Sequence, residues 1–131
     1  MISKSDKILV TGGTGFTGGQ LCKRLAEDGW HVRTIVRNRS KAKHLTEMGV
    51  EVCAGDLADA ASVTKAMEGI DRVYHIAALF REGKATYDDL YAVNAQGTKH
   101  VLDAAVAAKV KRFVHCSTIG VHGDVKNPPA H

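Results

Sequence analysis

Residues 7–18 read KILVTGGTGFTG, and this stretch decides the fold. Its first part, Lys7–Thr11, is a short run of β-forming residues that ends abruptly at a glycine pair. Such a run predicts a buried strand followed by a tight turn. From Gly15 the apolar residues recur at helical spacing, and Gly29 is placed to cap the end of that helix. The stretch therefore predicts a strand, a glycine-rich turn and a helix, in that order.

The turn has the glycine spacing GxxGxxG. The first glycine permits a tight turn, the second lets the backbone approach a pyrophosphate, and the third lets the helix pack closely on the sheet. N–H groups at the start of the helix then face the phosphates. A glycine-rich turn without a ligand is the alternative, but the strand and helix on either side favour nucleotide binding. The residues predicted to form this part of the cofactor site are Gly12, Thr14, Gly15, Phe16, Thr17 and Gly18.

Strand and helix patterns alternate along the rest of the chain, which implies a parallel sheet because parallel strands need a crossover each time. The further strands are predicted at His31–Val36, Val50–Ala54, Asp71–Ala77 and Lys111–Cys116. The helices are predicted at Ser40–Met48 with Ser40 as cap, from the cap Asp59 to Glu68, and at Tyr87–Lys109, with a loop at Leu79–Thr86. We expect an α/β, Rossmann-type doubly wound sheet of about five strands in the order 3-2-1-4-5.

The last part of the chain, residues 117–131, shows no periodicity and holds both prolines. A complete doubly wound domain has a further strand, so we expect one nucleotide-binding domain over residues 1–131 that is incomplete at its C-terminus. The substrate would then be bound mainly by a region that follows.

The composition is that of a globular α/β protein, with 44% hydrophobic and 24% charged residues among 131. No leader peptide and no membrane span are expected, which makes the cytoplasm the expected location. Three widely spaced cysteines are expected to be reduced thiols, and the spacing of the seven histidines predicts no metal site. The net charge of +4 admits an anionic ligand, but no aromatic residues accompany the basic ones, so we expect a small phosphorylated ligand and no nucleic acid.

Two short segments bear on which nucleotide binds. The end of the second strand normally carries an acid that binds the adenosine ribose, but here residues 36–39 read VRNR. Arg37 is suited to a 2′-phosphate, so we predict NADP(H) with NAD(H) as the second choice; a solvated basic loop is the alternative. After the third strand, Asp56 is expected to accept from the adenine amino group and Leu57 to pack on the ring. Asp56 as a simple helix cap is the alternative.

The glycine turn and the Asp56-Leu57 pair together resemble the extended branch of the short-chain dehydrogenase/reductase superfamily, the NAD(P)-dependent epimerases, dehydratases and related reductases. Residues 75–78, which read HIAA, are similar to the family's small-residue segment that lines the cofactor cleft, so the resemblance implies cofactor contacts for Ala77 and Ala78. Residues 93–98, VNAQGT, resemble the family signature VNxxGT. In that signature the asparagine, here Asn94, supports the backbone of the active site.

Residues 117–123, STIGVHG, resemble the family segment SSxxVYG. The resemblance implies that Thr118 supplies the hydroxyl that hydrogen-bonds the substrate, with Ser117 beside it; His122 replaces the usual tyrosine. The family's catalytic tyrosine, followed four residues later by lysine, lies beyond this loop. The three tyrosines of this chain, Tyr74, Tyr87 and Tyr91, all precede it.

The resemblance implies that the parent protein transfers hydride, as an epimerase, dehydratase or reductase acting on a nucleotide sugar or related alcohol or ketone, and that this N-terminal part alone has no turnover. An NADP-sensing regulatory module of the same fold is the alternative reading. We also expect the apolar face of the long helix, with Val93, Val101 and Ala105, to be partly uncovered. This would favour a homodimer or the exchange of an element between chains.

Overall fold

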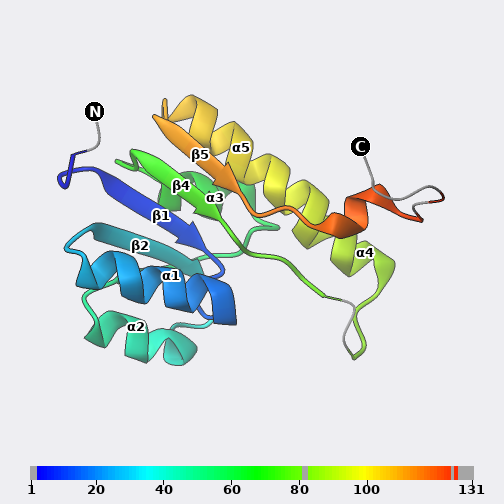
Figure 1. The fold of residues 1–131 in the computed structure, drawn as a ribbon, viewed down its shortest axis with the longest axis horizontal. Helices are drawn as coiled ribbons and strands as arrows, with labels where there is room; N and C mark the ends of the chain where they lie inside the picture. The colour runs from blue at the N-terminus through cyan, green and yellow to red at the C-terminus, as the bar shows by residue number, and fades with distance from the viewer. Residues whose placement is uncertain (1–2, 81–82, 125, 127–131) are drawn as a thin grey trace.

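The computed structural model describes residues 3–80, 83–124 and 126. It contains five parallel strands in the order β3-β2-β1-β4-β5, which confirms the predicted fold class and strand order. The strands are β1 (Lys7–Thr11), β2 (His31–Val36), β3 (Glu51–Ala54), β4 (Arg72–His75) and β5 (Arg112–His115). All of them point the same way, so their carboxyl ends meet at one edge of the sheet (Figure 1).

Helices cover both faces of the sheet (Figure 1). Their bounds, with those of the short 3₁₀ and π turns, are α1 (Phe16–Glu27), η1 (Arg39–Ala42), α2 (Lys43–Glu47), α3 (Ala60–Met67), α4 (Tyr87–Leu90), η2 (Tyr91–Gln96), α5 (Gly97–Ala107) and η3 (Ile119–His122). The packing follows from the alternation of side chains along each strand. In β1, Ile8 and Val10 pack with Cys22 of α1, whereas Leu9 packs with residues of α3 and α5.

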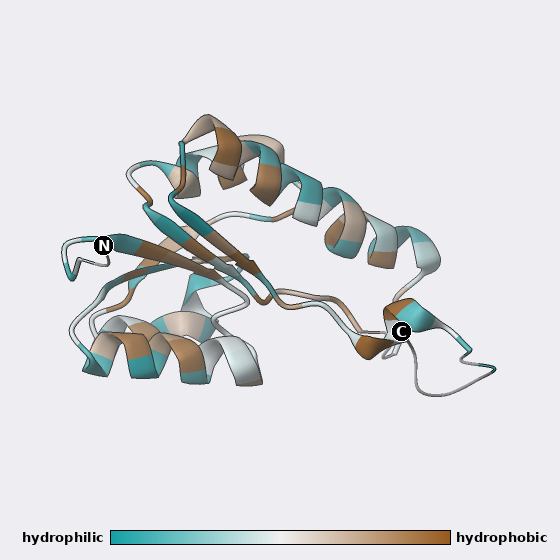
Figure 2. Ribbon diagram, turned by 45° about the horizontal axis from the view of Figure 1, so that its top comes forward, coloured by the Kyte–Doolittle hydropathy of each residue, from teal (hydrophilic) through white to brown (hydrophobic). Residues whose placement is uncertain are grey.

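Figure 2 shows the result as hydrophobic strands enclosed between helices whose hydrophilic sides face outward. A sheet buried on both faces is strongly apolar in sequence, as the short strand runs are. Burial of the central strand is nearly complete, since Leu9 and Val10 are at most 1% exposed. The rigid centre of the domain therefore lies directly behind the turns at the carboxyl edge.

Several predicted boundaries differ from those of the structure. Ser40 does not cap the helix after β2; Asn38 does, because its side chain accepts from the backbone N–H of Ser40 at 2.9 Å. The fourth strand ends at His75 rather than Ala77, because the N–H groups of Ile76 and Ala77 turn toward the Thr11 hydroxyl. The segment expected to be a loop after Cys116 contains the 3₁₀ turn η3, and residues 125 and 127–131 lie outside the described residues.

The long helix also differs from its prediction. Instead of one α-helix over Tyr87–Lys109, the structure has α4, the π-helical turn η2 and α5 in succession. The π turn rotates the helix, and α5 directs Val101 and Ala105 into the core, where they are 0% and 5% exposed. The prediction that these two residues are partly uncovered was therefore wrong, whereas Val93, in η2, is half-buried. The exposed large apolar residues of α5 are Leu102 and Val106, on another face of the helix.

Candidate functional site

The glycine turn lies where β1 ends, at the carboxyl edge of the sheet. Gly12 has a φ of +78°, a conformation that side chains rarely adopt, and a Cβ placed on it would lie 2.9 Å from the backbone of Ala77. A Cβ on Gly18 would collide with the carbonyl group of Gly12. The turn is held by a hydrogen bond from the Gly15 N–H to the Gly12 carbonyl at 3.0 Å. These glycines allow three backbone segments to pass closer together than any side chain permits.

The start of α1 suits an anion. Gly15 is its N-cap and supplies no capping side chain, and the first turn of the helix contains no acidic residue. The N–H groups at a helix start lack partners within the helix and carry the positive end of the helix dipole. Phe16, the first helical residue, is 88% exposed and stands beside this position. The turn and the helix start together form a place for a pyrophosphate.

A cavity of about 140 Å³ lies beside the turn, at the carboxyl ends of β1, β2 and β3. It is lined by Gly12, Thr14, Ile35, Val36, Arg37, Gly55, Asp56, Leu57, Ala77, Leu79 and Val93. Six residues predicted from the sequence therefore line one cavity, although they come from four separate parts of the chain: Gly12, Thr14, Arg37, Asp56, Leu57 and Ala77. The Asp56 carboxylate accepts the backbone N–H of Ala58 at 2.9 Å, while Asp59 caps α3 by accepting from Ala61. Asp56 is therefore not the cap of that helix.

A hollow of about 480 Å³ adjoins this cavity and is lined by Thr14, Val36, Arg37, Asn38 and Lys41. Thr14, Val36 and Arg37 line both spaces. Arg37 directly follows β2 and Lys41 lies in the 3₁₀ turn η1 of the same connection, so two cationic residues line one hollow. Lys41 was not among the predicted site residues; the signal that could have found it was the group of basic residues that follows the second strand.

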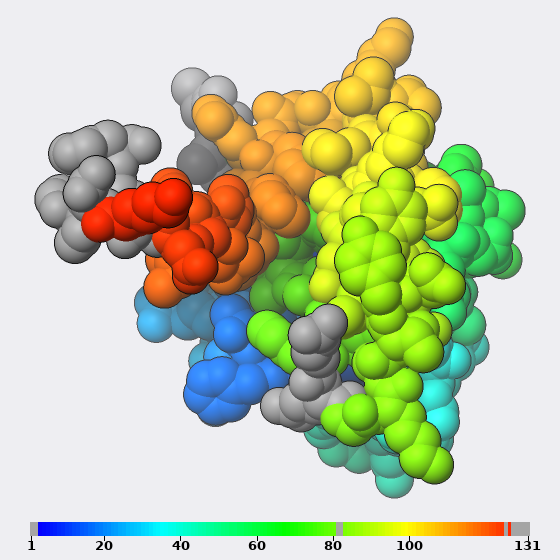
Figure 3. Space-filling model, turned by 90° about the vertical axis from the view of Figure 1, so that its right-hand side faces the viewer, coloured from blue at the N-terminus to red at the C-terminus, as the bar shows by residue number. Residues whose placement is uncertain are grey.

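A further cavity, of about 390 Å³, lies on the other side of the glycine turn. It is lined by Ala77, Ala78, Leu79, Phe80, Asn94, Thr98, His115, Cys116, Ser117 and Thr118. Figure 3 looks onto this edge of the molecule, where the segments after β4 and β5 and the helix from α4 to α5 come together. The predicted pair Ser117 and Thr118 therefore shares a cavity with the predicted Ala78 and Asn94.

Asn94 lies in the π turn η2 and binds the segment that follows β4. Its Oδ1 accepts the backbone N–H of Leu79 at 2.7 Å, and its Nδ2 donates to the Leu79 carbonyl at 2.8 Å. The side chain thus replaces both partners that a strand would give Leu79. π turns are frequent at functional sites because they redirect a side chain from the regular helical spacing. Here the turn directs Asn94 toward the backbone of the cavity wall.

Four of the predicted residues lie outside the walls of these three spaces: Gly15, Phe16, Thr17 and Gly18. They form the turn and the helix start that adjoin the first cavity. Sequence reasoning also missed a buried histidine, His75, that hydrogen-bonds the side chains of Thr11 and Thr98. Its signal in the sequence was a histidine at the end of a predicted central strand.

Within residues 3–80, 83–124 and 126, no group of three or more histidine, cysteine or acidic side chains is arranged to hold a metal ion. The same residues include no helix with the length and apolar character needed to cross a bilayer. The arrangement consists of a glycine turn, a helix start and cavities on either side of the turn. These features define a dinucleotide-binding Rossmann domain.

Comparison with known proteins supplies the family. The family described as NAD dependent epimerase/dehydratase matches residues 8–131, and this chain belongs to it. The chain is 41% identical to a 2-alkyl-3-oxoalkanoate reductase of Stenotrophomonas maltophilia over 93% of this chain and 36% of that protein. It is 38% identical to a 3 beta-hydroxysteroid dehydrogenase/Delta 5-->4-isomerase of Mycobacterium tuberculosis over 92% of this chain and 34% of that protein.

Solved structures with a similar fold belong to the same superfamily. A short-chain dehydrogenase/reductase superfamily protein from Agrobacterium tumefaciens, solved with bound NAD, superimposes with a TM-score of 0.81 at 34% identity. The match covers 94% of this chain and 36% of that one. The chain thus spans about a third of the length of these relatives and corresponds to their N-terminal, nucleotide-binding part.

Proposed function

We propose that this chain is the NADP(H)-binding part of a reductase or dehydrogenase that transfers hydride between the nicotinamide and an alcohol or ketone. The observation that carries the choice of NADP is the hollow lined by Arg37 and Lys41. It adjoins the cavity that Asp56 and Leu57 line. A nucleotide whose adenine lies against Leu57 has its ribose directed toward that hollow, where a 2′-phosphate meets two cations.

The cavity on the far side of the glycine turn is the proposed place of the nicotinamide and the reacting carbon. Ala77 and Ala78 leave room for a planar ring, and the hydroxyls of Ser117 and Thr118 line the same cavity. Thr118 is the proposed hydrogen-bond donor to the substrate oxygen. Its Oγ1 accepts the Gly120 N–H at 3.2 Å, an arrangement that leaves the hydroxyl proton available to a substrate.

Apolar side chains favour one substrate class. Leu79 and Phe80 line the far cavity, and Phe80 is 73% exposed at its rim. The two curated relatives described above are named for an oxoalkanoate and a hydroxysteroid. An alcohol or ketone with an apolar body therefore suits this site better than a nucleotide sugar. The diphosphate of a nucleotide sugar, in addition to that of the cofactor, requires more cations than the cavity offers. Most of the substrate contacts are assigned to a part of the parent protein outside these 131 residues.

The test is a titration of the chain with NADPH and NADH, each followed by the change in reduced-nicotinamide fluorescence and by calorimetry. We expect saturable binding of both cofactors, with NADPH at least about tenfold tighter, because one charge-assisted phosphate contact contributes about 1.5–3 kcal/mol. Equal affinities would remove the preference for NADP. Failure of both cofactors to bind would overturn the proposed function itself.

A further inference from the structure

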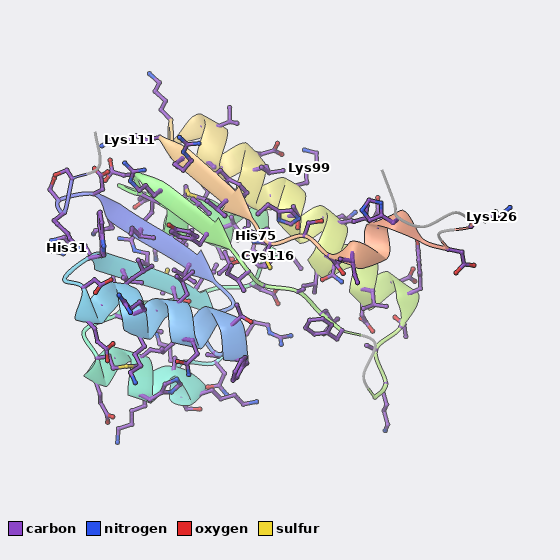
Figure 4. All side chains as sticks on the ribbon, viewed as in Figure 1. His31, His75, Lys99, Lys111, Cys116 and Lys126 are labelled. Carbon is purple, nitrogen blue, oxygen red and sulfur yellow. The ribbon has the colours of Figure 1, made fainter. Side chains whose placement is uncertain are left out.

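His75 ends β4 directly behind the glycine turn, and its ring is 1% exposed (Figure 4). Its Nδ1 lies 2.7 Å from the hydroxyl oxygen of Thr11, on β1. Its Nε2 lies 2.8 Å from the hydroxyl oxygen of Thr98, on α5. The ring thus joins the central strand of the sheet to the helix that follows the π turn. Both ring nitrogens have a partner, and both partners are hydroxyl groups.

The other hydrogen bonds of these hydroxyls decide which nitrogen carries the proton. Thr98 donates its hydroxyl proton to the carbonyl of Asn94 at 2.7 Å, so toward His75 it can only accept. Nε2 is therefore the protonated nitrogen. The Thr11 oxygen accepts the N–H groups of Ile76 and Ala77, both at 3.1 Å, which uses its two lone pairs. Its own proton is left to donate to Nδ1, which is consequently unprotonated.

One tautomer, neutral with the proton on Nε2, satisfies every member of this chain of hydrogen bonds. An imidazolium would direct an Nδ1–H at an oxygen that already accepts two bonds. Burial, and to a smaller extent the neighbouring His115, lower the pKa of His75 to about 4, which keeps the ring neutral. Its ring neighbours are His115 at 5.3 Å and Phe113 at 6.2 Å between centroids.

The two ends of this series of hydrogen bonds hold the segment that follows β4. Thr11 fixes the turn of Ala77, the residue against which Gly12 packs. Thr98 fixes the carbonyl of Asn94, whose side chain binds both backbone groups of Leu79. Ala77 and Leu79 line both the first cavity and the far one. The hydrogen bonds through His75 therefore hold the segment after β4 from two sides, at Ala77 through Thr11 and at Leu79 through Thr98 and Asn94.

We propose that His75, in its neutral Nε2–H form, is a positioning residue that couples the glycine turn to the Asn94–Leu79 contact, and so places the segment that lines both cavities. It touches neither cofactor nor substrate and acts through Thr11 and Thr98. The hydrogen bonds that join Thr11, His75 and Thr98 do not depend on the ligand. Its consequence for NADPH affinity rests on the proposed function.

The first experiment determines the tautomer by long-range ¹H–¹⁵N correlation of the imidazole groups at pH 7, with His75 assigned by comparison with His75→Gln. We expect Nε2 to resonate as a protonated and Nδ1 as an unprotonated nitrogen. A protonated Nδ1, in either the other tautomer or the imidazolium, would overturn the proposal. The measurement needs no cofactor, so its result stands whether or not NADPH binds.

The second experiment tests the coupling with Thr98→Val, which removes the acceptor for Nε2–H but keeps the shape of the side chain. Thr98→Ser restores the hydroxyl. Thr64→Val is the matched control, because the Thr64 hydroxyl also donates to the carbonyl four residues earlier, at 2.9 Å, but lies on α3 and bonds no histidine. The readouts are hydrogen exchange of the Leu79 amide and the Kd for NADPH.

We expect exchange at Leu79 to rise about tenfold in Thr98→Val, and the Kd for NADPH to rise by a similar factor, with Thr98→Ser and Thr64→Val close to wild type. Exchange at Leu79 in Thr98→Val that matches Thr64→Val would overturn the coupling. If wild type binds neither cofactor, the proposed function fails, and the exchange data alone decide the role of His75.

Discussion

The backbone of Ala77 lies so close to Gly12 that a Cβ on Gly12 would stand 2.9 Å from both its N and its Cα. This contact joins the turn after β1 to the turn after β4, two strands that are neighbours in the sheet. Two features that are 65 residues apart in the sequence, the glycine motif and the small-residue segment, therefore form one wall of the cofactor cleft. The glycine is required by this contact as well as by its own backbone conformation.

The first prediction concerns Gly12→Ala, compared with Gly29→Ala. The two glycines have almost the same φ, +78° and +80°, but no atom lies within 4 Å of a Cβ on Gly29. Both substitutions should lose about 1–2 kcal/mol through backbone strain, and Gly12→Ala should lose a further 1–3 kcal/mol through overpacking. Urea unfolding measures the difference. Equal losses of unfolding free energy in the two variants would show that the structure accommodates a Cβ beside Ala77 at no energetic cost.

The second prediction concerns cofactor choice. Arg37→Ala should weaken NADPH binding by about 10- to 100-fold and leave NADH binding within about threefold of wild type, because the guanidinium is assigned to the 2′-phosphate alone. Calorimetric titration with each cofactor measures both values. Lys43→Ala is the control, because Lys43 is a nearby cation that pairs with Glu47 at 4.0 Å and does not line the hollow. A parallel loss of NADH affinity in Arg37→Ala would contradict the assignment.

The third prediction concerns pH. The pKa of His75 is about 4 in the folded chain and has an ordinary value of 6.5, so between these values the unfolded chain binds the additional proton. Stability should therefore fall as the pH drops from 6.5 toward 4, by up to about 1.4 kcal/mol per pH unit from this residue. Urea unfolding at pH 7 and pH 5 measures the change. The pKa of the Asp6 carboxyl is held below its usual 3.8, mainly by the hydrogen bond from Lys111. The loss of stability that comes from protonating Asp6 therefore occurs at lower pH than the loss from His75.

The control for that measurement is His75→Gln, which removes the titrating group but leaves an amide that can still donate toward Thr98. Its stability should change less between pH 7 and pH 5 than that of wild type. His31→Gln, at the exposed opposite end of the sheet (Figure 4), should retain the full wild-type change. A pH dependence that is the same in wild type and His75→Gln would remove His75 as its source.

The fourth prediction concerns Asn94→Ala, which removes both hydrogen bonds to the Leu79 backbone. The variant should be destabilised by about 1–2 kcal/mol, and the Leu79 amide should exchange faster. Asn94→Asp retains the acceptor for the Leu79 N–H but loses the donor to the Leu79 carbonyl. Its loss of stability should lie between those of wild type and Asn94→Ala, and should exceed that of Asn94→Ala where the carboxylate repels the Leu79 carbonyl. Gln96→Ala, in the same π turn, is the control and should remain close to wild type.

The fifth prediction concerns turnover. The 131 residues contain no tyrosine followed four positions later by lysine, the pair that the family resemblance implies for proton transfer. We expect the chain to bind NADPH without oxidising it in the presence of 3-oxoacyl or ketosteroid substrates. Absorbance at the wavelength of reduced nicotinamide measures this. Steady oxidation that Thr118→Val abolishes would show that the chain is catalytic by itself.

The sequence by itself determined the fold class and the strand order. The runs Lys7–Thr11 and His31–Val36 were predicted with the bounds that the structure shows, because short apolar runs beside glycine turns leave few alternatives. The residues of the glycine turn could be named because their types follow from the shape of a phosphate-binding turn, whereas Ala77, Ala78 and Asn94 were named from the family resemblance. Hydrophobic pattern and turn chemistry are local properties, and a sequence displays them directly.

Only the tertiary structure decided how the long helix is divided and which of its faces is buried. Periodicity predicted one helix, and its apolar face was expected to be partly uncovered. A π turn at Asn94 divides the helix, and Val101 and Ala105 pack in one core cluster with residues of α3. The hydrogen-bonded chain through His75 was equally hidden, because its members at positions 11, 75 and 98 meet only when β1, β4 and α5 pack together. A buried polar group is paired by whatever the fold brings beside it, and no local pattern encodes that partner.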